Sequence, residues 1–244
     1  MKLEKCLTVV VAVAGALGAA GVTAPAALAS CSQTSDTGIW VRSADSTMGH
    51  GVQGQVLVHS QNAGDCPAAG YVSGEGTMYM GVGGGTTGNW AEIGWQQIQN
   101  LGGPTWELFT EWGTNGQTSG EHLFTSGCAA VNTWTTFKVV LTDATNHLWA
   151  MQYACNGGGF TTHSTSNNLF YGYGWPEGEI SHHSTNGPTY YDSYQSLIYK
   201  NRSDVWSTSW GSYACANDTA PISWDARSSS PSAYTTSTYS SGIC

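Results

Sequence analysis

The sequence predicts an all-β protein, folded as an antiparallel sandwich of two sheets. Beyond the N-terminal segment, no apolar pattern of helical period is long enough to form a helix of useful length. Short alternating runs bounded by Gly, Asn, Ser and Thr recur instead. About ten strands at this spacing indicate a sandwich or a closed barrel. We predict a two-sheet sandwich in one disulfide-stapled domain, because about 215 residues suit a single all-β domain.

The strands are predicted from these alternating runs. In chain order they span residues 55–59, 77–80, 106–112, 136–141, 147–153, 190–199, 206–213 and 222–224. Two further strand-like segments, 90–95 and 174–180, contain glutamates. The tail 227–241 is rich in Ser, Thr and Tyr, a composition typical of linkers. Because Cys244 follows it, a terminal disulfide would hold this tail against the domain.

The N-terminal residues 1–29 read as a secretory signal, which leaves 30–244 as the domain. A charged start precedes an apolar run that ends at Ala27-Leu28-Ala29, an A-x-A cleavage site. No other stretch approaches the length of apolar residues needed to span a bilayer. Leu28-Ala29-Ser30-Cys31 also reads as a lipobox, so lipid anchoring through Cys31 is the alternative to free secretion.

The number of cysteines favours free secretion. Removal of the signal takes away Cys6 and leaves an even set, as disulfides in an oxidising compartment require. Lipidation of Cys31 would leave one cysteine without a partner. The set is Cys31, Cys66, Cys128, Cys155, Cys215 and Cys244. Pairing each cysteine with its neighbour in sequence gives Cys31–Cys66, Cys128–Cys155 and Cys215–Cys244, one of many possible connectivities.

Charge and motifs exclude several functions. Lys and Arg total 7 against 16 Asp and Glu, so nucleic acid is not an expected partner. The run 83–88 fits G-x-G-x-x-G but precedes no helix, so we predict a hairpin loop there. His182-His183 lacks further residues at metal-ligand spacing, and we expect neither metal nor cofactor. The absence of G-x-S-x-G leaves a serine nucleophile unsupported.

Two glutamates stand out because their surroundings are aromatic and apolar. Glu92 lies in Trp90-Ala91-Glu92-Ile93-Gly94-Trp95, and Glu179 lies in Gly174-Trp175-Pro176-Glu177-Gly178-Glu179-Ile180, although only 9% of residues are charged. An unpaired buried charge is costly, so such positions point to a function. Two glutamates brought together in a cleft could share a proton and act as acid and base.

Strand alternation places Trp90, Glu92 and Gly94 on one face, and we expect Gly94 to leave room beside the carboxylate. Pro176 predicts an edge or bulged strand, on which Glu177 and Glu179 project to the same side. The alternative is that these acids are ordinary solvent-facing strand residues. By pattern alone they do not differ from the chain's remaining strand glutamates, Glu75, Glu107, Glu111 and Glu121.

Three segments in order resemble the catalytic domain of the neprosin family of glutamic peptidases. They are Ala91-Glu92-Ile93-Gly94-Trp95, Leu108-Phe109-Thr110-Glu111-Trp112 and 175–180, within a resembling region of about 72–194. The resemblance implies a β-sandwich with Glu92 and Glu179 as catalytic residues. The last motif is one residue longer than the family's W-G-G-E-[IV] segment, so Glu177 competes with Glu179 for the second role.

The resemblance implies hydrolysis of protein or peptide substrates, with a preference for proline-containing peptides. One glutamate would activate water and the other would protonate the leaving nitrogen, so activity should peak at acid pH. Trp95 and Trp175 are candidate site-lining residues, although each is also a plausible core residue. Gln96 or Gln97 is a candidate donor to an oxyanion, and alternation allows only one of them to face the site.

Two other functions fit the same composition. A sandwich glycoside hydrolase would also use two carboxylates in an aromatic cleft. A lectin-like carbohydrate-binding module would need no pair of acids, and it predicts that Glu92 and Glu179 lie apart. Fold alone does not separate these functions. The sequence leaves open the roles of the two glutamates and the oligomeric state.

Overall fold

The structure is a computed structural model. It describes the backbone of residues 31–33, 38–43, 48–58, 60, 71–82, 88–99, 104–124, 127–169, 171–179, 182–184, 191–208, 210–216, 223–230 and 233–239. Side chains are described for residues 48–58, 60, 76–81, 88–98, 104–124, 127–169, 171–174 and 193–208. The predicted signal, residues 1–29, lies outside these ranges.

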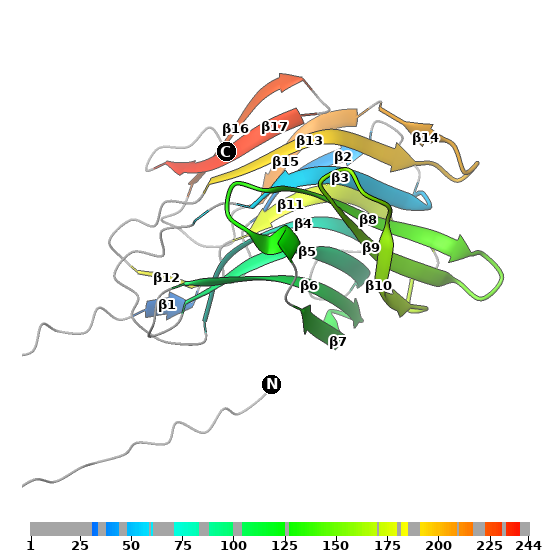
Figure 1. Cartoon of the computed structure of the whole chain (residues 1–244). Helices are drawn as coiled ribbons and strands as arrows, with labels where there is room; N and C mark the ends of the chain where they lie inside the picture. Colours follow the sequence, from blue (N-terminus) through cyan, green and yellow to red (C-terminus); the bar gives the residue numbers. More distant parts are fainter. Residues whose placement is uncertain are drawn as a thin grey trace, which may run out of the picture.

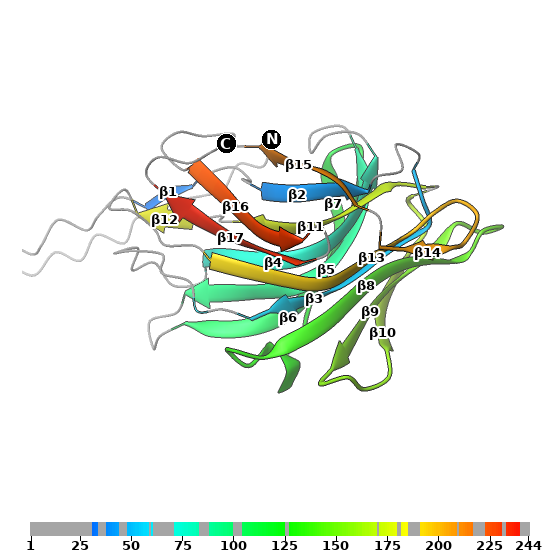
Figure 2. The same cartoon turned by 90° about the horizontal axis from the view of Figure 1, so that it is seen from above.

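Two antiparallel sheets stack as the layers of a sandwich, and they confirm the predicted fold class (Figures 1 and 2). The eight-stranded sheet runs β10 (Thr161–Ser166), β9 (Leu148–Cys155), β8 (Trp134–Asp143), β3 (Gly51–Leu57), β13 (Tyr191–Lys200), β17 (Ala233–Tyr239) and β16 (Ser223–Ser230), with β14 (Trp206–Ser207) beside β13. The five-stranded sheet runs β11 (Tyr173–Glu179), β4 (Tyr71–Val82), β5 (Asn89–Gln99), β6 (Thr105–Thr114) and β7 (Gln117–Phe124).

Small elements complete the described fold. β1 (Cys31–Gln33) pairs with β12 (His182–Ser184), and β15 (Trp210–Ala216) pairs with β2 (Gly38–Ser43). The short 3-10 turn η1 (Gly127–Ala129) is the only helical element within the described ranges. Among the residues that the structure describes, no helix is long and apolar enough to cross a membrane.

Each strand predicted from the sequence overlaps an observed strand, but β1, β2, β7, β10, β12 and β17 were not predicted as strands. β7 and β10 contain few apolar residues, and most of their side chains are exposed or partly exposed. They are the end strands of the two sheets, where one side has no neighbour. An amphipathic alternation is therefore absent from their sequence. The tail with linker-like composition forms β17 and half of β16, which pair with each other and extend the eight-stranded sheet.

The core lies between the two sheets. Met78, Ile93 and Trp95 of the five-stranded sheet are fully buried, as are Phe137 and Trp149 of the eight-stranded sheet. Burial of each such side chain contributes about 1.5–3 kcal/mol. On β5, the core face carries Ala91, Ile93 and Trp95, as strand alternation predicts. Glu92 lies on the opposite, outer face of that sheet.

A two-residue turn joins β6 to β7. Asn115 and Gly116 both have positive φ, 53° and 72°, which is the backbone of a type I′ hairpin turn. The Gly116 N–H donates to the Gly88 carbonyl at 2.8 Å. The Asn115 N–H donates to the side-chain oxygen of Asn89 at 2.9 Å. The turn is thereby tied to the start of the strand that carries Glu92.

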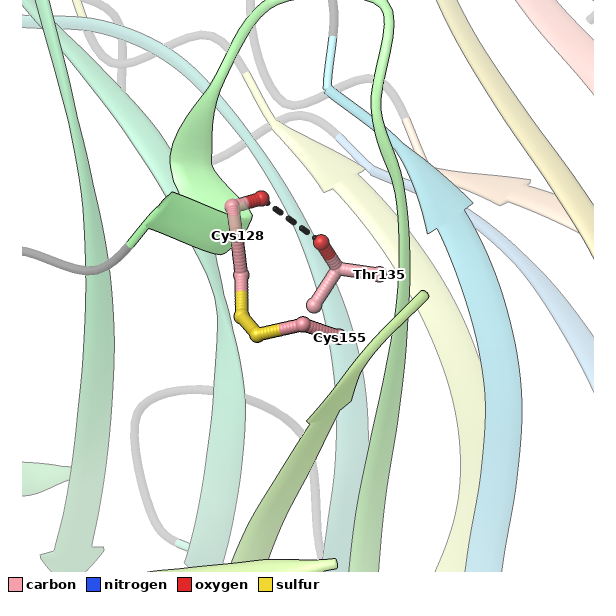
Figure 3. Close-up of a disulfide and its surroundings, with 3 residues drawn as sticks. All are labelled: Cys128, Thr135 and Cys155. Carbon is pink, nitrogen blue, oxygen red and sulfur yellow. Dashed lines mark hydrogen bonds between the residues drawn. A yellow bond between two sulfur atoms is a disulfide. The ribbon is translucent and has the colours of Figure 1, made fainter. Parts of the chain in front are cut away.

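The predicted Cys128–Cys155 disulfide is present and joins η1 to the end of β9, with the Cα atoms 5.3 Å apart (Figure 3). The hydroxyl of Thr135 donates to the Cys128 carbonyl at 2.7 Å beside it. Closing a loop of this length stabilises the fold by about 3–4 kcal/mol. The other two predicted pairs each include a cysteine outside the described residues.

Aromatic and histidine rings hold β7 against β10 at one end of the sandwich. His163 stacks on Phe124 with ring centroids 3.6 Å apart, and its edge faces His122 at 6.3 Å. His122 stacks on Trp112 at 5.3 Å, and Phe124 packs against Tyr153 at 5.2 Å. Burial, and to a smaller extent the charge of His122, lower the pKa of the His163 imidazole below its ordinary value.

This pKa shift predicts that acid destabilises the cluster. The unfolded chain regains the ordinary histidine pKa and binds a proton first, so stability is complete above about pH 6.5 and falls as pH decreases toward the folded-state pKa. His163→Phe keeps the stacking on Phe124 and removes the proton. We expect its melting temperature to drop less than that of the wild type between about pH 7.5 and about pH 5. An identical drop in both proteins would contradict the assignment.

Candidate active site

One face of the molecule collects the glutamates. By backbone register, every glutamate after Glu4 occupies a position on the outer face of the five-stranded sheet. We call this surface the glutamate face. Its members are Glu75 of β4, Glu92 of β5, Glu107 and Glu111 of β6, Glu121 of β7, and Glu177 and Glu179 of β11. Carboxylates on one face repel each other, so gathering them there lowers stability, and this cost makes the face a candidate functional surface.

Glu92 is at the middle of a row that crosses the sheet. Tyr79 of β4 is directly opposite it on one side, and Glu111 of β6 is opposite it on the other. Glu121 of β7 is opposite Glu111 and extends the row to the sheet's end. Cβ atoms of directly opposite residues lie about 4.5–5.5 Å apart. Directly opposite glutamates in this row therefore have their side chains on the same face and within reach of each other.

Glu92 and Glu111 differ in their surroundings. Both side chains are partly buried. The Glu111 carboxylate accepts a hydrogen bond of 2.5 Å from the hydroxyl of Thr118 on β7. That bond draws Glu111 toward the β7 side of the sheet, away from β4 and β11. Glu92 lies on the central strand of the five-stranded sheet, with β4 between it and β11.

The glutamates of β11 are placed by register alone, because the structure describes no side chain between residues 175 and 179. β11 ends the five-stranded sheet, as Pro176 predicts. Trp175 pairs with Tyr79 and so stands in the row of Glu92; Glu177 is one row further and Glu179 two rows further. Two strand spacings and these offsets put their Cα atoms about 12 Å and about 16 Å from that of Glu92.

Gly94 does not leave open space beside Glu92, contrary to the prediction. A Cβ atom at Gly94 would lie 2.7 Å from the Thr77 methyl carbon and 2.9 Å from the Thr77 Cα. The missing side chain therefore admits the neighbouring strand β4 and not a substrate. The physical reason is cross-strand: Thr77 is directly opposite Gly94, and the sequence around Gly94 carries no information about that partner.

The predicted supporting residues separate by face. Gln96 is 2% exposed and lies on the glutamate face, opposite Glu75 and Glu107. Gln97 is on the core face, so alternation places only one of the two glutamines on the glutamate face. Trp95 is fully buried on the core face and stabilises the sandwich, and it does not line the glutamate face. Trp175 has its backbone in the Glu92 row.

The sequence reasoning missed Thr77 and Tyr79, which flank Glu92 on β4. Tyr79 is directly opposite Glu92, and Thr77 is the diagonal neighbour of Glu92. Thr77 is 1% exposed. Among the described side chains, its hydroxyl is one of two buried polar atoms without a hydrogen-bond partner, the other being the Trp95 indole nitrogen. No local sequence signal identifies these residues, because they come to Glu92 only through strand pairing.

An asparagine network fixes the strand of Glu92. The side-chain nitrogen of Asn168 donates to the carbonyl of Trp90 at 2.9 Å and also to that of Gly113 on β6. The Asn168 carbonyl accepts from the side-chain nitrogen of Asn89 at 2.6 Å. Asn168 lies in the connection that leads to β11. The network therefore joins the strand of Glu92 to the segment that precedes Glu177 and Glu179.

Metal ligands are not grouped in the described part of the chain. Within those ranges, no three or more histidine, cysteine, aspartate or glutamate side chains are arranged to hold a metal ion. The chemistry that the glutamate face offers is proton transfer between carboxylates and a bound molecule.

No protein-family model matches the sequence, and no curated protein matches it. Among solved structures, the chain is similar to scytalido-glutamic peptidase with a transition state analog inhibitor: 14% identity, TM-score 0.52, with 86% of this chain and 100% of that chain covered. It is also similar to SCP-B, a member of the Eqolisin family of peptidases in complex with a tripeptide: 13% identity, TM-score 0.48, with 86% and 98% covered. A native glycosidic hydrolase gives 11% identity, TM-score 0.36, and coverage of 86% and 80%. The first of these shows a shared sandwich fold.

Proposed function

We propose that this protein is a secreted glutamic peptidase that hydrolyses peptide bonds at acid pH. The observation that carries the proposal is the position of Glu92 at the centre of a face on which every glutamate after Glu4 is gathered by register. The sandwich fold shared with a solved glutamic peptidase supports it. The order of the sequence motifs around Glu92 and Glu179 is the second support.

In the proposed mechanism, Glu92 and Glu179 act as the acid and base of one reaction. The ionised carboxylate takes a proton from water, whose oxygen attacks the carbonyl carbon of the scissile peptide. The protonated carboxyl then gives its proton to the leaving nitrogen as the carbon–nitrogen bond breaks. The products are a carboxylic acid and an amine, and the proton returns between the two glutamates through solvent. Glu177 is the alternative partner, one row closer to Glu92.

The pair explains why acid pH is expected. One carboxyl must carry a proton and one must be ionised, and only acid solutions maintain that state for ordinary glutamates. As pH rises, the second proton is lost and the donor for the leaving nitrogen disappears. The proposal needs no metal and no cofactor. The preference for proline-containing peptides that the sequence resemblance implies belongs to this proposal as well.

The test is digestion of two unstructured proteins, one rich in proline and one poor in it, across about pH 3 to about pH 8 with a metal chelator present. We expect cleavage with a maximum at acid pH and a near-complete loss at neutral pH. Mass spectrometry of the fragments gives the cleavage sites and tests the preference for proline. Equal rates at acid and alkaline pH would contradict the two-carboxylate mechanism.

A polysaccharide panel under the same conditions separates the other functions. If the wild type cleaves neither unstructured protein but releases reducing sugar from a polysaccharide, it is a glycoside hydrolase. If it binds a polysaccharide but hydrolyses neither proteins nor polysaccharides, it is a carbohydrate-binding module. Either result overturns the peptidase proposal.

A further inference from the structure

Thr77 carries a buried hydroxyl that the fold leaves unsatisfied. The residue is 1% exposed, and its Oγ1 has no hydrogen-bond partner among the described residues. A buried hydroxyl without a partner costs about 1–3 kcal/mol. Such groups are rare in folded proteins and call for an explanation. By contrast, the equally buried hydroxyls of Thr110 and Thr135 are bonded to Ser164 and to the Cys128 carbonyl.

Thr77 occupies the position next to Glu92 on the glutamate face. It is directly opposite Gly94 on β5 and opposite the backbone of Glu177 on β11. Glu92 is its diagonal neighbour, and diagonal residues of an antiparallel pair lie about 7–8 Å apart. An oxygen atom of a bound molecule, placed between the side chains of Thr77 and Glu92, can accept a hydrogen bond from the Thr77 hydroxyl. The Glu92 carboxylate can act on an adjacent water at the same time. Thr77 thus lies between the strand of Glu92 and the strand of the second acid.

The rings of Tyr79 and Trp90 do not fill this position. The Tyr79 ring fills the space over Gly81, and the Trp90 ring fills the space over Gly113. Gly81, Trp90 and Gly113 form the row on the far side of Glu92 from Thr77. The methyl group of Thr77 faces Gly94, where any side chain would collide with it. Gly94 thereby fixes the side chain of Thr77 through its methyl group.

We infer that the Thr77 hydroxyl is a catalytic group of the proposed peptidase, a donor to the oxygen of the attacked peptide carbonyl; the inference rests on the proposed function. As water adds to the carbonyl carbon, the carbon–oxygen π pair moves to the oxygen, which becomes an oxyanion. The hydroxyl donates to that oxyanion and keeps its own proton. When the carbon–nitrogen bond breaks, the pair returns to the carbonyl and the leaving nitrogen takes its proton from a glutamate. A fixed donor in a site shielded from water is most effective at this step.

The experiment compares wild type, Thr77→Val, Thr77→Ser and Thr110→Val, with Glu92→Gln in the same assay. Valine keeps the shape of threonine and removes the hydroxyl. We expect Thr77→Val to lower kcat about a hundredfold or more while KM changes less than about threefold. Its melting temperature should stay the same or rise, because the lost hydroxyl had no partner. Thr77→Ser should restore kcat to within about tenfold of the wild type.

Thr110→Val is the matched control, since Thr110 is fully buried on the core face and its hydroxyl is 2.8 Å from that of Ser164. It should lower the melting temperature and leave kcat within about twofold of the wild type. An active wild type with unchanged kcat in Thr77→Val overturns this inference alone. A parallel loss of kcat in Thr77→Ser, which keeps the hydroxyl, also overturns it, because activity would then depend on the packing of the Thr77 side chain and not on its hydroxyl. An inactive wild type overturns the proposed function itself.

Discussion

Glu92→Gln is expected to lower kcat on an unstructured protein at acid pH by about a thousandfold. Glutamine keeps the size and most of the hydrogen-bonding capacity of glutamate, but it cannot take or give the proton. General acid–base catalysis contributes about 10²–10⁴-fold, and the variant loses that contribution. The fold should persist, because the change removes a negative charge from a face where glutamates repel each other. Steady-state kinetics together with a thermal melt measure both expectations.

Glu121→Gln is the matched control for Glu92→Gln. Glu121 belongs to the same row of the glutamate face, but it lies on the end strand β7 and is exposed. Its removal changes the charge of the face equally without touching the centre of the row, so kcat should stay within about threefold of the wild type. If Glu92→Gln keeps full activity while Glu92→Ala loses it, Glu92 acts through hydrogen bonding and is not the base.

Glu179→Gln is expected to cause a loss of the same order, about a hundred- to a thousandfold in kcat, because the reaction would lack one of its two proton-transfer groups. The acid limb of the pH–rate profile should disappear or move, since one of the two apparent pKa values of the pair is removed. The measurement is kcat across about pH 3 to about pH 7 for each variant.

Glu177→Gln is the control for this second loss, because Glu177 lies on the same strand and the same face two residues away. We expect it to keep kcat within about tenfold of the wild type. The register puts Glu177 closer to Glu92, about 12 Å against about 16 Å between Cα atoms, so the pair of variants is a sharp test. A large loss in Glu177→Gln with an active Glu179→Gln would make Glu177 the partner.

The sequence was most informative where one strand face is buried. The alternation predicted that Ala91, Ile93 and Trp95 lie on one face of the strand and Glu92 and Gly94 on the other, and the burial of the first set together with the register confirms it. The pairing of Cys128 with Cys155 was also predicted correctly, from neighbours in sequence. Both inferences depend on local order along the chain, which the sequence contains directly.

The sequence was least informative about contacts between strands. Gly94 read as open space, because nothing in segment 90–95 shows that Thr77 of β4 stands opposite it. The same limitation hid Thr77 and Tyr79 as neighbours of Glu92. β7 and β10 were missed because polar end strands lack the alternating pattern by which strands are recognised. The residues of the candidate site come together through the pairing register of the strands, which the composition of the sequence does not reveal.

The separation of charge between the two sheets has a physical consequence for the whole molecule. The lysine and arginine side chains that the structure describes are Lys138, Lys200 and Arg202. Lys138 and Lys200 lie on the outer side of the eight-stranded sheet, since their strand neighbours Phe137 and Tyr199 face the core. The glutamates are gathered on one face, whereas Lys200 on the other sheet is paired with Asp204 at 2.8 Å. In dilute salt a cationic polymer attracts the glutamate face, which turns Glu92 toward the polymer, whereas an anionic surface repels that face. Both effects weaken as added salt shortens the Debye length.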